Sequence, residues 1–137
     1  MSWNEVNSAG KKEGLRKKFK SFFSREYFSK PMVLWLLSLI LLANLAEWTL
    51  LFIFIKPVDL PLILHYNVYF GVDVTGSWKQ VYFLPAIGLF LFIVNWLLSL
   101  YFYKNQERVA AYLLLLAAFF IQLSLLIAAA SVIMINY

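Results

Sequence analysis

Three long apolar runs dominate the chain, and shorter segments rich in polar residues, proline or glycine separate them. The first run covers about residues 32–55, and its only strongly polar members are Asn44 and Glu47. The second run covers about residues 79–103 and the third about residues 109–135. Because a helix needs roughly 20 apolar residues to cross a bilayer, the pattern predicts an all-α integral membrane protein with three antiparallel transmembrane helices.

The two connections between these runs differ in length and character. Lys104 to Arg108 forms a short polar turn, so we expect the second and third spans to be antiparallel neighbours. The longer connection contains helix-interrupting residues, namely Pro57, Pro61, Gly71 and Gly76. Residues 62–70 are rich in branched and aromatic side chains and predict a short strand, whereas residues 71–76 predict a turn.

The composition agrees with a membrane location. The chain has 137 residues, of which 63% are hydrophobic and 14% are charged. A soluble domain typically carries about 25% charged residues, so much of this surface must face something other than water. The chain has no cysteine, which excludes disulfides, cysteine-based zinc sites and a cysteine nucleophile.

Positive charge is concentrated before the first apolar run. Of twelve Lys and Arg residues, only Lys56, Lys79, Lys104 and Arg108 follow residue 30. A basic segment next to an apolar run favours anionic lipid as its partner and not nucleic acid. We therefore divide the chain into a basic segment, residues 1–30, and a transmembrane domain, residues 31–137.

The basic segment also carries aromatic residues at helical spacing. This pattern predicts an amphipathic helix on the membrane surface, although a merely solvated basic tail is an alternative. The residues expected to contact lipid are Lys11, Lys12, Lys17, Lys18, Phe19, Phe22, Phe23 and Arg25.

The distribution of Lys and Arg also predicts the orientation. Cytoplasmic flanks of membrane helices carry an excess of these residues, and the N-terminal flank and the 104–108 turn are the most basic. The connection over residues 56–79 balances two Lys against Asp59 and Asp73. We therefore expect a multi-pass protein of the cell membrane, with a cytoplasmic N-terminus and an extracytoplasmic C-terminus.

Each predicted span carries a polar residue deep in the hydrocarbon, namely Asn44 and Glu47, Asn95, and Gln122. At about 1.5 Å per residue, all four fall within a layer roughly 10 Å thick. A charged Glu there is costly. One interpretation is a proton or cation site, or a contact with a partner subunit. The other is a protonated Glu47 that hydrogen-bonds to Asn or Gln and holds the helices in register.

Small residues accompany these polar groups and mark the faces on which helices approach closely. In the third span the stripe contains Ala111, Ala118, Gln122 and Ala129. In the second span it contains Gly88, Asn95 and Ser99. These stripes predict that the polar groups face a helix partner and not lipid.

The long connection holds the single histidine, His65, with Asn67 and Asp73 nearby. These three residues are the candidates for an extracytoplasmic site. Zinc requires three or four ligands, so they make a weak metal site, and we predict neither a metal nor a cofactor. A Ser-His-Asp arrangement needs a nucleophile in defined geometry, and Ser77 and Thr75 alone are no evidence for one. No catalytic residue is therefore assigned.

The same connection resembles a small membrane domain of unknown function at the N-terminal end of Sdp-immunity-type proteins, which protect producing bacteria from a secreted toxin. The matching residues are Pro61, His65, Tyr66, Asn67, Gly71, Asp73 and Pro85. The sequence departs from that pattern at Val72, where proline is expected, and in a slightly longer stretch before Gly71. The further spans of the full-length proteins are absent from these residues, so the resemblance implies a shared membrane module more than immunity.

Three functions follow from these observations. The first is a non-enzymatic membrane module that packs against a membrane-protein partner or against itself. The second, implied by the resemblance, is an immunity or sensor protein that contacts an extracellular ligand through residues 57–78. The third is a small transporter or proton-coupled subunit built on Glu47. An enzyme is not expected, because no convergent acid, base and nucleophile are visible.

Overall fold

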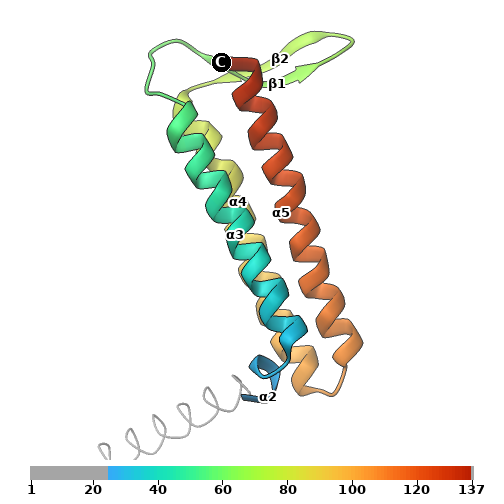
Figure 1. The fold of residues 1–137 in the computed structure, drawn as a ribbon. Helices are drawn as coiled ribbons and strands as arrows, with labels where there is room; N and C mark the ends of the chain where they lie inside the picture. The colour runs from blue at the N-terminus through green and yellow to red at the C-terminus, as the bar shows by residue number, and fades with distance from the viewer. Residues whose placement is uncertain (1–24, 137) are drawn as a thin grey trace, which may run out of the picture.

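A computed structural model describes residues 25–136 of the chain (Figure 1). Its helices are α2 (Arg25–Phe28), α3 (Pro31–Phe54), α4 (Phe83–Lys104) and α5 (Arg108–Asn136). The last three are long and apolar enough to cross a membrane, with Trp78–Tyr82 adding a 3-10 turn before α4. The three predicted helices are therefore present. Residues 11–24 of the predicted surface helix lie outside the described part.

Successive helices run in opposite directions, so α3 and α5 are parallel, and α5 packs against both α3 and α4 (Figure 1). Proline at the first position of α3 suits a helix start, since its missing N–H has no helical partner there. The short turn between α4 and α5 contains Gln106, whose φ of 66° reverses the chain. The inner faces pack into apolar clusters at the α2 end, the middle and the opposite end of the bundle.

The connection between α3 and α4 is a β-hairpin, so the fold is not purely α-helical. Strands β1 (Leu62–Asn67) and β2 (Gly71–Gly76) pair antiparallel. The expected strand is present in β1, but the expected turn over residues 71–76 is wrong, because that segment is the second strand. The actual turn is residues 68–70, and Gly71 returns the chain with a φ of 80°, which glycine adopts without strain.

Candidate functional site

The middle of the bundle holds a set of amide hydrogen bonds that joins all three long helices. The Asn44 side chain donates from Nδ2 to the Pro85 carbonyl at 2.9 Å and to Gln122 Oε1 at 3.3 Å. Gln122 in turn donates from Nε2 to the Gly88 carbonyl at 2.7 Å. We call Asn44, Gln122 and these two carbonyls the amide layer. It satisfies polar groups that lipid could not.

Gly88 lets the helices approach closely enough for the amide layer to form. A Cβ at this position would lie 2.9 Å from Leu125 Cδ1, 3.0 Å from Gln122 Oε1 and 3.2 Å from Asn44 Nδ2. A methyl group would thus press on both amides at once. The small-residue stripe of α5 also faces inward, since Ala111, Ala118 and Ala129 are buried.

Glu47 lies one helical turn beyond Asn44 on the same face of α3 and is completely buried. Neither of its carboxyl oxygens has a hydrogen-bond partner among the residues that the structure describes. The expected bond to Asn or Gln is therefore not made. An ionised, unpaired carboxylate is strongly penalised in such surroundings, so the site suits a neutral carboxyl that keeps its proton.

Among the described residues Asn95 does not join the amide layer, and its predicted contact with a partner stays a prediction. Its Nδ2 donates to the Leu91 carbonyl of its own helix at 2.9 Å, and the side chain is only partly buried. A side chain that bonds the carbonyl four residues earlier satisfies itself without a second helix. The polar layer therefore unites Asn44 and Gln122, with Glu47 buried beside them.

The candidates in the connection between α3 and α4 divide into a pair and a turn residue. His65 Nδ1 lies 2.7 Å from Asp73 Oδ1 across the hairpin, and both side chains are well exposed. Asn67 instead accepts a hydrogen bond from the Tyr69 amide at 2.9 Å, which closes the turn. The described residues contain no group of three metal-ligating side chains of the His, Cys, Asp and Glu types.

Sequence reasoning missed a second polar centre, which docks α2 onto the bundle. Tyr27 is fully buried, and its hydroxyl lies 2.9 Å from Ser99 Oγ. Since Ser99 Oγ donates to the Ala111 carbonyl at 2.8 Å, the Tyr27 hydroxyl is the donor to Ser99. Burial raises the pKa of Tyr27, which keeps this donor protonated, and the Ser99 bond only partly opposes that rise.

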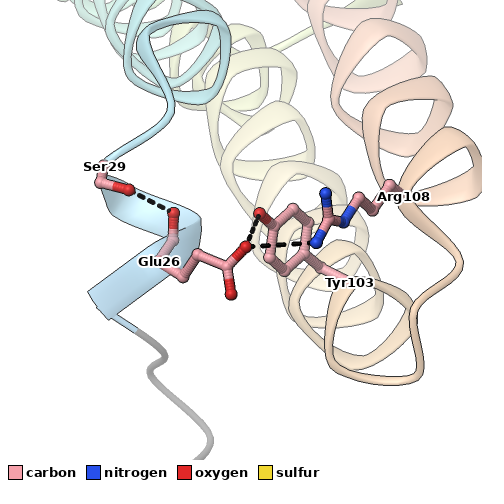
Figure 2. Close-up of polar contacts among 4 residues, drawn as sticks. All are labelled: Glu26, Ser29, Tyr103 and Arg108. Carbon is pink, nitrogen blue, oxygen red and sulfur yellow. Dashed lines mark hydrogen bonds and ion pairs between the residues drawn. The ribbon is translucent and has the colours of Figure 1, made fainter.

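Charged groups close the same end of the bundle (Figure 2). Glu26 Oε1 accepts from the Tyr103 hydroxyl at 3.4 Å and pairs with the Arg108 guanidinium at 3.3 Å. The Ser29 hydroxyl donates to the Glu26 carbonyl at 2.7 Å. These bonds link the segment before α3 to the turn between α4 and α5. The available sequence signal was an acidic residue close to the start of the first span, within the basic segment.

Comparison with family models, with curated proteins and with solved structures gives no match for this chain.

Proposed function

We propose that this chain is a non-enzymatic membrane module that associates with another transmembrane helix through the outer face of α5. The observation that carries the proposal is a row of small residues on that face, spaced seven apart. Ala117, Ser124 and Ser131 are exposed, and Ala110 continues the row with partial exposure. This row is separate from the inner stripe, which α3 and α4 already cover.

The chemistry of the row favours helix association over lipid contact alone. The hydroxyls of Ser124 and Ser131 donate to the carbonyls of Phe120 and Ile127, each at 2.9 Å. The hydroxyl groups of this row are therefore already satisfied within α5. Small residues allow a second helix backbone to come close in lipid. A seven-residue interval keeps the row facing that helix when the two wind around each other in a left-handed supercoil.

Photo-crosslinking in the native membrane tests this proposal. A photoreactive side chain at Ser124 should yield protein adducts, either with a second copy or with one membrane protein. Thr49 is the matched control, because it is exposed on α3 and its hydroxyl also bonds its own helix, at 2.7 Å to the Leu45 carbonyl. Protein adducts at Ser124 and lipid adducts at Thr49 support the proposal. Lipid adducts alone at both positions would exclude it.

The proposal includes a cell-membrane orientation with the α2 end in the cytoplasm. Lys30, Lys104 and Arg108 lie at that end, and the basic segment before it is expected to meet anionic lipid. Reporter fusions inserted after Gly71 and joined after Tyr137 should both show an external location. A cytoplasmic signal from either fusion would reverse the orientation.

Glu47 supports a second candidate, a proton-coupled or cation-coupled subunit. Its carboxyl is fully buried and unpaired within the described residues, and intramembrane acids of this kind commonly serve proton or ion pathways. Proton flux into vesicles that contain the purified protein tests it. Flux that Glu47→Gln abolishes, without loss of fold, supports coupling, whereas equal flux in both proteins excludes it.

A further inference from the structure

The β-hairpin projects sideways beyond the end of α5, as an arm beside the bundle (Figure 1). Its turn consists of Val68, Tyr69 and Phe70, which are 85%, 90% and 85% exposed. We call these three residues the arm tip. The stretch from Tyr66 to Val72 contains no charged residue. An apolar, aromatic tip at the far point of a projecting arm requires a physical explanation.

The base of the arm is fixed to the bundle by Asn136, near the C-terminal end of α5. Its Oδ1 accepts from the Ile63 amide at 2.8 Å, and its Nδ2 donates to the Ile63 carbonyl at 2.7 Å. One side chain thus takes the place of a neighbouring strand at this residue. Leu62 and Leu64 pack against the apolar cluster at this end of the bundle. The arm therefore leaves the bundle from a fixed base.

The length of α5 sets the level of the arm in the membrane. Its 29 residues extend about 43 Å at about 1.5 Å per residue, whereas the hydrocarbon core is about 30 Å thick. The end of α5 therefore reaches the headgroup layer, and Asn136 holds β1 there. An arm that leaves sideways at this level runs over the lipid that surrounds the bundle.

We propose that the arm tip inserts into the boundary between headgroups and acyl chains in the leaflet at the hairpin end. Tyrosine is enriched at this boundary because its ring is apolar and its hydroxyl is polar. The turn can enter because the Asn67 side chain already satisfies the Tyr69 amide. The polar candidates His65 and Asp73 lie in the middle of the two strands, back from the arm tip. The proposal depends on the helices spanning a bilayer, and does not require a second helix against α5.

A single fluorescent label measures the depth of the tip. Because the chain has no cysteine, Tyr69→Cys provides one attachment site for an environment-sensitive fluorophore in phosphatidylcholine nanodiscs, which leave both faces open to solvent. The expected result is blue-shifted emission, strong quenching by a lipid with a nitroxide near the headgroup, and weak quenching by iodide. Asp59→Cys, in the connection before β1, is the control and should show the reverse pattern.

Two results would overturn the proposal. Emission from the Tyr69→Cys label that is water-like and quenched by iodide would place the tip in solvent, where it could meet a soluble ligand. A label shielded from both quenchers would indicate protein contact. Phe70→Asp in the labelled chain should reduce nitroxide quenching severalfold, whereas Thr75→Asp on β2 should not. Because crosslinking at Ser124 does not involve the arm, failure of either proposal can be told from failure of the other.

Discussion

Asn44 and Glu47 lie one turn apart on the same buried face of α3, yet their hydrogen-bonding environments differ. Asn44 bonds to two other helices, through Pro85 and Gln122. Glu47 is at least as deeply buried, and its oxygens have no partner among residues 25–136. The same helix face thus contains a satisfied polar group and an unsatisfied one, and the difference comes from the neighbouring helices.

The comparison shows what each group contributes to the fold. The amide layer specifies how α3, α4 and α5 align, because its donors and acceptors meet only in one arrangement. The carboxyl of Glu47 specifies nothing of this kind and costs desolvation. A group that costs stability without fixing the packing is a candidate for function. Substitutions at both kinds of position test this contrast, through the free energy of unfolding in mixed micelles.

The largest effect is expected from Gly88→Ala, which should destabilise the bundle by about 2 kcal/mol. The added methyl would press on Leu125, Gln122 and Asn44 together, so these side chains must shift and the bonds of the amide layer weaken. Circular dichroism during unfolding measures the loss. Ala86→Val is the control, because Ala86 is exposed on α4 and should tolerate larger side chains. Equal stability of Gly88→Ala and the natural protein would show that the close approach is not required.

Gln122→Leu should destabilise by about 1 kcal/mol. It removes two interhelical bonds, and such bonds average about 0.6 kcal/mol each in membrane proteins. Asn95→Leu is the matched control, since among residues 25–136 Asn95 bonds its own helix and no other, and it should change stability little. If the two substitutions lower the free energy of unfolding equally, the amide layer contributes no more than a side-chain bond within one helix.

Glu47→Leu should have the opposite sign and stabilise the bundle by up to about 1 kcal/mol. It replaces an unpaired polar group with an apolar side chain of similar size, and no bond is lost. The same unfolding measurement, made beside Gln122→Leu, gives the sign directly. A destabilised Glu47→Leu protein would mean that the carboxyl makes a stabilising contact, and the contrast with Asn44 would fail.

The sequence predicted the parts of this contrast that depend on position along a helix. The spans, the depth of Asn44 and Gln122, and the inward stripe of α5 all follow from periodicity and rise per residue. The hydrogen-bond partner of each amide does not follow from periodicity, because an amide can bond a facing helix or the backbone of its own helix. Asn95 bonds its own helix. The charged or polar residues Glu26 and Asn136 act through chain segments far away in sequence, so spacing alone could not reveal their roles.

The hairpin shows a different limit of sequence reasoning. Residues 71–76 alternate valine with polar residues, which is a strand pattern, but glycines at both ends favoured a turn. The strand forms because β1 lies opposite and Gly71 supplies the left-handed turn residue. A hairpin is recognised only when both strands are considered together.

The smallest effect on stability is expected from Glu47→Gln. This substitution distinguishes a structural carboxyl from one that binds and releases a proton or cation. Gln has nearly the same shape as a protonated Glu, so the free energy of unfolding should change by less than about 0.5 kcal/mol. Unlike Glu47→Leu, this substitution keeps a polar group in place and removes only the ability to release a proton. A structural carboxyl would leave every property of the protein unchanged. If the carboxyl binds and releases a proton or cation, Glu47→Gln would leave the fold unchanged and abolish proton flux in vesicles.

Glu47→Asp is the companion variant, because it shortens the side chain yet keeps the exchangeable proton, and it should retain part of that flux. If Glu47→Gln unfolds the bundle instead, the carboxyl has a structural partner and the comparison with Asn44 no longer holds.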